Sequence, residues 1–414
     1  MSLRLFLLIA AGALSGRLAW IFLLLPPALY DAQEYLRLAR GIAAGLGYVG
    51  ASGEPTAFMP VGWPALGALG LLAFGDSATA LALVNLLAQA GAVGATIWLG
   101  RALELPRSRA LAAAAVVALA PNLFPYTVLL WSESTHLLFA TLAIAAAATA
   151  WRAPGERALP GAIVAGLAAG GAALIKTQSL LLVPALLLPL LLSAPSWARR
   201  LGLAAVLAAM AVGVMLPWSL RNLDQGGRWP VLATNAGWNL LIGFNPEAKG
   251  RYAELDTSAL DAALPPSPPG VASEIARGDA YARAALDDLR AEPMRALRLV
   301  PIKTLITLAD GDGFLMAGLT LDPSKPSLKD FTARPTIWRQ LFLVSNLWWL
   351  ALVLAAAVGA ARARQRGAVS FLAVAGAALL LPHMIVFGEP RFHIPLIPLL
   401  AVAACLPRAT RPAP

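Results

Sequence analysis

Two carboxylates stand close together directly after the first apolar stretch of the chain. Asp31 and Glu34 are three residues apart, so on a helix they share a face. A carboxylate beside a bilayer is costly to bury and usually serves a function. Asp31 is suited to accept a proton from an acceptor hydroxyl as a general base. The alternative is structural, because Asp at an N-cap with Glu three residues later is an acidic variant of the capping box. Both roles can coexist.

A second carboxylate opens a later apolar stretch, in the sequence Trp-Ser-Glu-Ser-Thr-His. Glu133 and His136 are three residues apart there, so we expect a polar pair that faces a cavity. The alternative is a helix N-terminus decorated with Ser and Glu, which the helix dipole favours. With Asp31 or Glu54, Glu133 would supply oxygen ligands for a divalent metal, although no spacing in the sequence demands one.

Two cations interrupt apolar residues far from the other basic residues. Lys176 follows one apolar stretch and Arg391 lies between the last two. Both are candidates for binding a lipid phosphate, Arg391 through its bidentate fork. Snorkelling to the membrane surface is the alternative. Arg17, well inside the first apolar stretch, is suited to pair with a carboxylate or to bind the same anion.

Amide side chains and a tryptophan in the middle of the chain suit a sugar. Trp218 stands before Arg221 and Asn222, and Asn235 and Asn239 follow in the next polar stretch. Planar hydrogen-bonding groups and aromatic faces are typical of sugar sites. Asn and Gly also form turns, so these residues alone are a weak signal.

The elements that position these residues must cross a membrane. The chain has 414 residues, of which 59% are hydrophobic and 13% charged, with a mean hydropathy of +0.70. Soluble domains carry roughly 25% charged residues. Apolar stretches recur near the length of ~20 residues that spans a bilayer, and only helices satisfy their own backbone there. The sequence therefore predicts an all-α polytopic membrane protein.

Charge and rare residues exclude several classes of function. The net charge of +10 is concentrated in short connections between apolar stretches, where it fixes orientation and does not indicate nucleic acid. The single Cys405 excludes an intramolecular disulfide and a cysteine metal cluster. Because the chain has only three histidines, we expect no multi-histidine metal site. The first apolar stretch contains Arg17 and lacks a clear cleavage motif, so we expect a retained helix.

Placing the basic connections inside predicts about ten spans with both termini cytoplasmic. The expected spans are 4–25, 78–99, 109–127, 131–151, 160–176, 178–193, 201–218, 338–360, 368–387 and 391–406. Two long segments, 26–77 and 219–337, then lie outside the cytoplasm within one domain that covers 1–414. In the first we expect interfacial helices at 31–45 and 61–74. In the second we expect a turn-rich stretch at 256–270 and helices at 273–290 and 293–308, the latter interfacial.

Taken in order, these motifs resemble the bacterial GT-C glycosyltransferases related to protein O-mannosyltransferases and the lipid A aminoarabinose transferase, of the family 39 type. The resemblance covers most of the chain. The motifs that carry it are Asp31-x-x-Glu34-Tyr35, Pro60-x-Gly-x-Pro64, Ser132-Glu133, Pro217-Trp-x-x-Arg221-Asn222, Gly237-x-Asn239 and Glu389-Pro-Arg391-Phe.

The resemblance implies a GT-C-like bundle, a polyprenyl-phosphate sugar donor, and a lipid, glycan or protein acceptor. It implies a bacterial inner-membrane enzyme whose site faces the periplasm, with Asp31 as the catalytic base. Lys176 departs from the arginine common in the family, and no soluble domain follows the last expected span. The second departure argues against transfer of an oligosaccharide to protein.

The function expected is therefore transfer of a hexose or pentose to an acceptor hydroxyl with inversion. Asp31 and Glu133 are the expected catalytic residues. The expected substrate-binding residues are Glu34, Tyr35, Glu54, His136, Lys176, Arg221, Asn239 and Arg391. One alternative is a transporter or flippase of polyprenyl-linked sugars, although no internal repeat is evident. Another is a polymerase or ligase of lipid-linked glycans.

Overall fold

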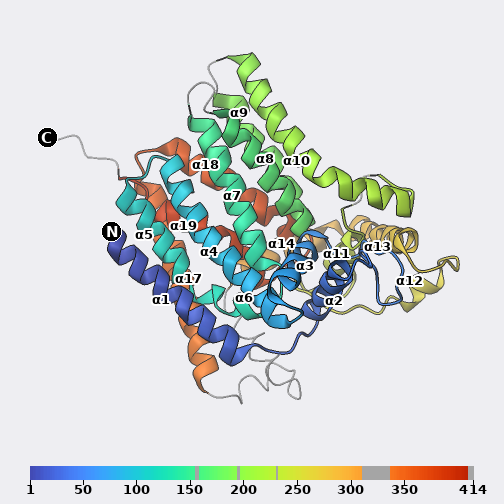
Figure 1. The fold of residues 1–414 in the computed structure, drawn as a ribbon. Coiled ribbons are helices and arrows are strands. Elements are labelled where there is room, and N and C mark those ends of the chain that lie inside the picture. The colour runs from blue at the N-terminus through green and yellow to red at the C-terminus, as the bar shows by residue number, and fades with distance from the viewer. Residues whose placement is uncertain (154–157, 194–195, 230–231, 310–335, 409–414) are drawn as a thin grey trace.

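The computed structural model describes residues 1–414 except 154–157, 194–195, 230–231, 310–335 and 409–414. The described residues form helices joined by short connections, with three isolated β-bridges and no strand longer than a bridge among them. The predicted all-α class is thus confirmed (Figure 1). Part of the second long segment, 310–335, lies outside the described residues.

The helices follow the chain in this order: α1 Leu3–Leu24, α2 Asp31–Ala43, α3 Gly62–Phe74, α4 Ala78–Ala102, α5 Arg107–Ala118, η1 Pro121–Leu123, α6 Pro125–Val128, α7 Glu133–Arg152, α8 Ala158–Ile175, η3 Thr177–Leu181, α9 Leu182–Ser193, α10 Trp197–Gly226, α11 Ala236–Gly243, α12 Ser258–Ala262, α13 Val271–Ala291, α14 Pro293–Leu308, α17 Thr336–Arg362, α18 Arg366–Ile385, η4 Pro390–Leu396 and α19 Ile397–Ala404.

Seven of the described helices are long and apolar enough to cross a membrane: α1, α4, α7, α8, α10, α17 and α18. An eighth span results if α5 and the helical turns at Pro121–Val128 count as one, bent by 51°. Pro121 and Pro125 explain this bend, because proline interrupts the hydrogen-bond ladder of a helix. The expected spans 178–193 and 391–406 are shorter apolar helices that begin with 3-10 turns. The count of ten therefore stays a prediction.

The buried centre of the bundle is α7, which packs against α4 and α8. Small residues allow close approach of these helices. Gly170 on α8 faces α10, where an added Cβ would lie 2.6 Å from the carbonyl oxygen of Ala211, and Gly166 has no room for one either. The four-residue spacing of these glycines indicates close helix packing, and the structure confirms it.

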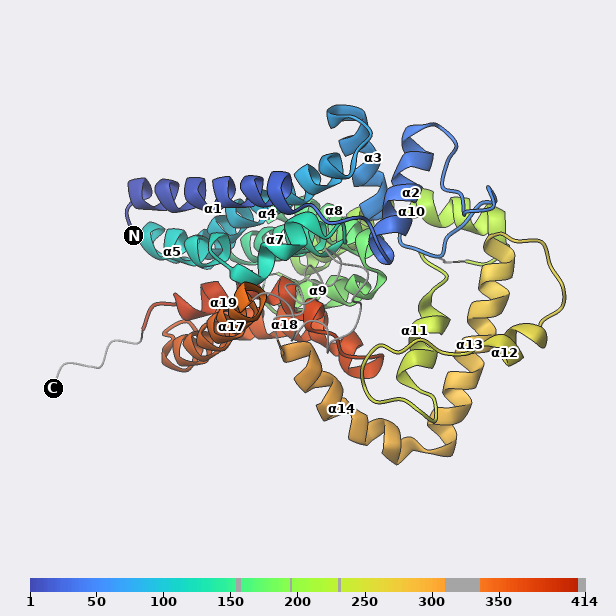
Figure 2. The ribbon, with the colours of Figure 1, turned by 90° about the horizontal axis from the view of Figure 1, so that it is seen from below.

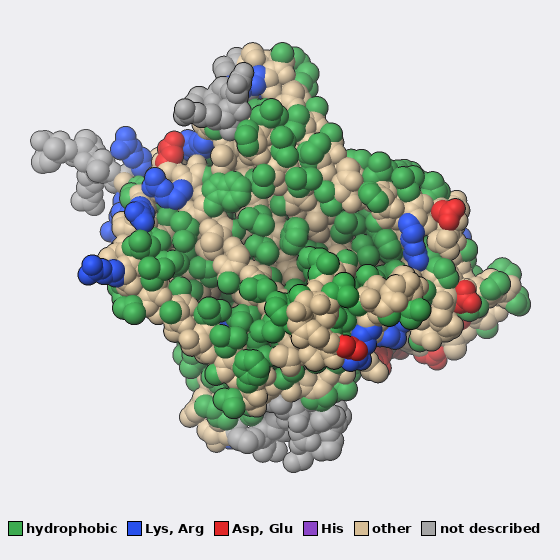
Figure 3. Space-filling view, viewed as in Figure 1, with side chains coloured by type: hydrophobic (Ala, Val, Ile, Leu, Met, Phe, Trp, Pro, Cys, Tyr) green, Lys and Arg blue, Asp and Glu red, His purple; other side chains and the backbone are tan. Residues whose placement is uncertain are grey.

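The helices of the two long segments gather at one end of the bundle. Figure 2 shows α2, α11, α12 and α13 at the end opposite the two termini. Helices α2, α3, α13 and α14 match the expected helices, while the stretch 256–270 also contains the short α12. The space-filling view shows a broad hydrophobic face, with Lys and Arg on the side of the termini and further charged groups at the opposite end (Figure 3). A hydrophobic face between two charged ends is typical of a protein that spans a membrane.

One basic residue of the expected interfacial helix α14 does not face the surface. Lys303 is fully buried, and its Nζ donates to the carbonyl oxygens of Ile385 at 2.7 Å and Gly243 at 3.2 Å. Burial lowers the pKa of Lys303 to about 8. Lys303 therefore joins α14 to α11 and α18, which the sequence pattern of leucines and basic residues did not indicate.

The orientation of the bundle predicts that Ser52 and Ser108 lie on opposite sides of the membrane. Only α4 lies between them as a candidate span, and both side chains are exposed. In a Cys405→Ser background, Ser52→Cys should react with an impermeant thiol reagent added outside cells, and Ser108→Cys only after permeabilisation. Ser52 is chosen because the neighbouring Gly53 has a φ of 86°, which would strain a cysteine. Labelling of both positions from one side would contradict the topology.

Candidate active site

Asp31 is the first residue of α2, at the end of the bundle where the outer helices gather. The N-cap is Tyr30, which has a positive φ of 54°, and no side chain caps the helix. The capping alternative for Asp31 is therefore wrong. The Asp31 carboxylate instead accepts a hydrogen bond from Nη1 of Arg391 at 3.1 Å, across 360 residues of sequence. The Asp31 side chain is 36% exposed, so an incoming molecule can reach it.

Glu133 begins α7 and is 2% exposed. Its Oε1 accepts a hydrogen bond from Nζ of Lys176 at 2.7 Å and lies 3.9 Å from Nε of Arg391. Its Oε2 has no hydrogen-bond partner among the described residues. Buried polar atoms usually have a partner, so this oxygen is positioned to receive one from a bound molecule.

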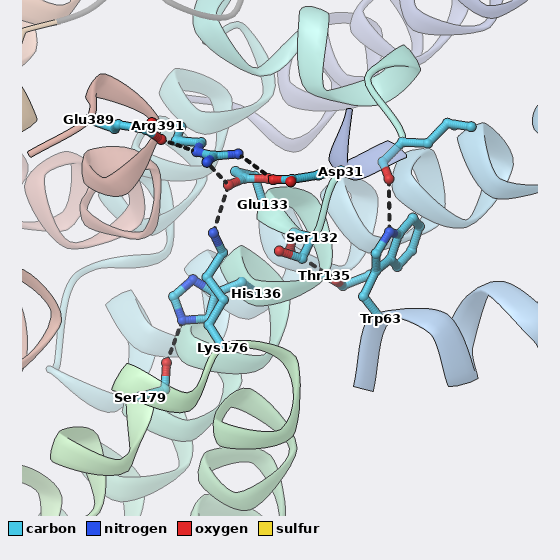
Figure 4. Close-up of polar contacts among 11 residues, drawn as sticks. Asp31, Trp63, Ser132, Glu133, Thr135, His136, Lys176, Ser179, Glu389 and Arg391 are labelled. Atoms are coloured by element: carbon cyan, nitrogen blue, oxygen red, sulfur yellow. Dashed lines mark hydrogen bonds and ion pairs between the residues drawn. The ribbon is translucent and has the colours of Figure 1, made fainter. Parts of the chain in front are cut away.

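Arg391 is the centre of the site (Figure 4). It lies on η4, where Nε contacts Glu389, and its guanidinium stacks 4.6 Å from the ring centre of Trp131. Asp31, Glu133, Glu389, Lys176 and Arg391 converge from four segments of the chain, and we call them the charge cluster. Its three carboxylates face two cations.

Tyr35 and His136 flank the charge cluster through partners of their own. Tyr35 is buried on α2 and hydrogen-bonded to Ser132; burial, with Asp31 and Glu133 nearby, raises its pKa. His136 is also buried, and its Nε2 lies 2.6 Å from the hydroxyl of Ser179. The expected polar pair between Glu133 and His136 is thus replaced by pairs with Lys176 and Ser179.

Three other predicted site residues lie elsewhere. Glu34 is turned toward Arg37, whose Nε and Nη2 donate to it at 2.9 Å and 2.5 Å. Glu54 is exposed in a turn and lines a separate depression that includes Glu274. Asn239 is half-buried on α11, which packs against α13. Their proposed contacts with substrate remain predictions.

Arg221, expected to bind substrate, holds the first long segment in place. Its Nη1 donates to the carbonyl oxygen of Thr56 at 2.7 Å and its Nη2 to that of Tyr48 at 3.0 Å. Glu274 anchors the same loop by accepting hydrogen bonds from the hydroxyl of Thr56 and the backbone N–H of Ala57. The loop at 48–57 is therefore fixed to α10 and α13.

Arg221→Met should loosen this loop. Hydrogen bonds to a charged group contribute about 1.5–3 kcal/mol each, so amide exchange at 48–57 should rise by roughly tenfold or more. Hydrogen-exchange mass spectrometry measures this effect. Arg228→Met is the matched control, because Arg228 on the next connection pairs with the exposed Asp279. Unchanged exchange at 48–57 in Arg221→Met would contradict the anchoring role.

Sequence reasoning did not assign two residues to the candidate site: one member of the charge cluster and one residue that contacts it. Glu389 enters the sequence analysis only as part of a motif, although its position two residues before Arg391 is a local signal. Trp131, directly before Ser132 and Glu133, was likewise not assigned to the site. For divalent metal, no group of three or more His, Cys, Asp or Glu side chains in the described ranges is arranged to hold an ion.

Part of the chain matches a protein family model. Residues 59–219 match the family model described as dolichyl-phosphate-mannose-protein mannosyltransferase. The match is less than half of the chain; it includes Glu133 and Lys176 but not Asp31 or Arg391. A search of curated proteins found no match to the sequence.

Solved structures share the fold. The Archaeoglobus fulgidus oligosaccharyltransferase in complex with Zn and sulfate has a TM-score of 0.54 and 15% identity, covering 96% of this chain and 48% of that one. The same organism's oligosaccharyltransferase AglB, in complex with an inhibitory peptide and a dolichol-phosphate, has a TM-score of 0.54 and 13% identity, covering 97% and 49%. ArnT from Cupriavidus metallidurans bound to undecaprenyl phosphate has a TM-score of 0.45 and 16% identity, covering 97% and 77%.

The chain spans about half the length of the two oligosaccharyltransferase structures. The resemblance to GT-C glycosyltransferases is confirmed by the family model and by the fold. The fold is helical, with seven or eight candidate membrane spans among the described residues, and it resembles the fold of the Archaeoglobus fulgidus oligosaccharyltransferase.

Proposed function

We propose that this chain is a membrane glycosyltransferase that moves a sugar from a polyprenyl-phosphate donor to an acceptor hydroxyl. The observation that carries the proposal is the charge cluster, in which Asp31, Glu133, Lys176 and Arg391 converge from distant segments. The match to a mannosyltransferase family model supports the class of reaction. An accessible carboxylate beside two cations at a bilayer edge suits a reaction whose leaving group is a lipid phosphate.

Exposure separates the roles of the three carboxylates. Asp31 is 36% exposed, whereas Glu389 is 18% and Glu133 2% exposed. A general base must come within hydrogen-bond reach of the hydroxyl that it deprotonates. Asp31 is therefore the base in this proposal. Glu133 holds Lys176 and lies near Arg391, and its free Oε2 is available to a hydroxyl of the bound sugar.

Arg391 and Lys176 stabilise the leaving group. In one displacement, the acceptor oxygen forms a bond to the anomeric carbon as the bond from that carbon to the phosphate oxygen breaks. The bonding electron pair moves to the phosphate, and the acceptor proton moves to Asp31. Negative charge grows on the phosphate, so cations positioned in advance lower the barrier. The donor phosphate must share Arg391 with Asp31 and Glu389, which already contact it.

The proposal places the site on the extracytoplasmic side of a bacterial inner membrane, with a lipid, glycan or protein as acceptor. The arginine-rich connections on the opposite side of the spans support this orientation. The labelling of Ser52 and Ser108 tests it separately from the chemistry.

Reconstitution in vesicles separates transfer from transport. The purified chain is incorporated into liposomes with a polyprenyl-phosphate sugar whose sugar is labelled, together with extracts of candidate acceptors. A transferase releases free polyprenyl phosphate as label appears on an acceptor. Movement of intact labelled lipid between leaflets without bond cleavage would establish a flippase instead. Growth of the lipid-linked glycan itself would identify a polymerase.

A further inference from the structure

Another buried cation lies within α1, outside the charge cluster. Arg17 on α1 is 4% exposed. Its Nε donates to the side-chain oxygen of Gln89 at 2.6 Å, and its Nη1 to the carbonyl oxygens of Ala118 at 2.8 Å and Ala13 at 3.3 Å. The ring of Phe124 lies 4.2 Å from the guanidinium carbon.

No carboxylate neutralises this charge within the part of the chain that the structure describes. None of the ion pairs among those residues includes Arg17, so the carboxylate partner expected from the sequence is not found there. The third guanidinium nitrogen, Nη2, makes no hydrogen bond to a described residue. Gln89 offers no further capacity, because its amide already contacts Arg17, Thr127, Leu123 and Ser134. A buried charge without a counter-ion is costly inside a membrane.

Arg17 lines a cavity of about 420 Å³ between α1, α4 and α5. Apart from Arg17 and Gln89, its walls are apolar, and Phe6, Ala10, Gly94 and Ile97 extend it away from the charge. From Arg17 to Phe6 the groove follows α1 for about 16 Å. We call this cavity the Arg17 groove. Helix α1 is a candidate membrane span, and only 17% of the residues in its most apolar stretch are buried, so lipid would border the groove in a bilayer.

We propose that the Arg17 groove binds a single-chain lipid with an anionic oxygen headgroup. The headgroup accepts hydrogen bonds from Arg17 through Nη2, and the hydrocarbon chain lies along the apolar wall toward Phe6. A single chain fits because the volume is near the lower end of ligand pockets, which range over about 300–1,000 Å³. The headgroup supplies the missing counter-charge, and the walls supply the burial of apolar surface.

The Arg17 groove contains no residue of the charge cluster, but hydrogen bonds connect it to α7, the helix that begins with Glu133. Gln89 bridges Arg17 to the hydroxyl of Ser134, which directly follows Glu133 at the start of α7. The binding site therefore has to be tested by ligand binding, because an effect on activity would not distinguish it from the charge cluster.

Two glycines provide a matched pair of variants. A Cβ added at Gly94 or at Gly12 would meet nothing within 4 Å, so neither substitution requires the backbone to move. Gly94 lines the groove, whereas Gly12 is not among the residues that line it. Gly94→Leu therefore fills the groove, and Gly12→Leu places the same side chain outside it. Arg17→Met removes the charge, and Gly94→Leu keeps the test valid if Arg17→Met does not fold.

The experiment measures saturable binding of labelled dodecyl phosphate to the purified full chain. Gly94→Leu and Arg17→Met should each lower the affinity of one saturable binding component at least tenfold. Gly12→Leu and Arg391→Ala should retain that component with the affinity of the parent. Neither dodecyl maltoside, which has the same chain without the charge, nor inorganic phosphate should displace it. Binding that is equal in all variants, loss in Gly12→Leu as large as in Gly94→Leu, or full displacement by dodecyl maltoside or by inorganic phosphate would overturn the proposal.

Discussion

Asp31→Asn should lower the rate of sugar transfer by about 10²–10⁴-fold while the protein remains folded. The substitution removes the basic oxygen but keeps a carbonyl oxygen at the same place, able to accept the hydrogen bond from Arg391 that now measures 3.1 Å. The substitution removes no helix cap, because no side chain caps α2 in the parent. Loss of the charge in the first turn of α2 costs about 0.3–1 kcal/mol of helix stability. Donor binding should therefore change far less than turnover.

The control for this experiment lies near the same helix. Asp76→Asn removes an exposed carboxylate that pairs with Arg40 of α2 at 2.7 Å, and it should leave transfer near that of the parent. Release of lipid phosphate per enzyme molecule measures turnover in both variants. A folded Asp31→Asn enzyme with near-parental turnover would leave Asp31 only its ion pair with Arg391.

Arg391→Lys should impair both donor binding and turnover, even though the charge remains. A single ammonium group on a flexible stem cannot reproduce the planar fork that reaches Asp31 and Glu389 from different nitrogens. Loss of one group that stabilises growing charge in a transition state typically costs about 10²–10³-fold in turnover. Arg391→Ala should be more severe, because Glu133 then retains only Lys176 as a cation.

Arg40→Lys is the matched control, since Arg40 makes an exposed ion pair with Asp76 away from the cluster. Equilibrium binding of a polyprenyl phosphate and single-turnover transfer measure the two effects separately. If Arg391→Lys and Arg391→Ala both bound and turned over the donor like the parent, the phosphate assignment would be wrong. Arg391 would then be a surface-directed cation with a structural role.

Most of the fold followed from the sequence because its signals are local. A helix that crosses lipid needs about 20 apolar residues, and its ends are marked by arginines or glycines. The helices at 31–43, 62–74 and 293–308 also agree with the sequence pattern within a few residues. The 51° bend near Pro121 was missed, because an apolar stretch of sufficient length conceals whether it stays straight.

Four residues of the charge cluster could be predicted from the sequence for a different reason. Asp31, Glu133, Lys176 and Arg391 are each out of place in an apolar context, and such residues need partners. The sequence did not reveal which partners. His136 contacts Ser179 and Glu34 contacts Arg37, although simple spacing had favoured other pairs. The role of Arg221 could not be predicted from the sequence, because Arg221 bonds to carbonyl oxygens more than 160 residues away along the chain.

The anomeric configuration of the transferred sugar tests the central claim most directly. A single displacement with Asp31 as base must invert the anomeric carbon relative to the polyprenyl-phosphate donor. The parent enzyme is given a donor of known anomeric configuration, and nuclear magnetic resonance measures the anomeric configuration of the product. We expect inversion. Retention would contradict the account, because it requires a second displacement through a sugar bound covalently to the enzyme, in which Asp31 would not act as the base alone.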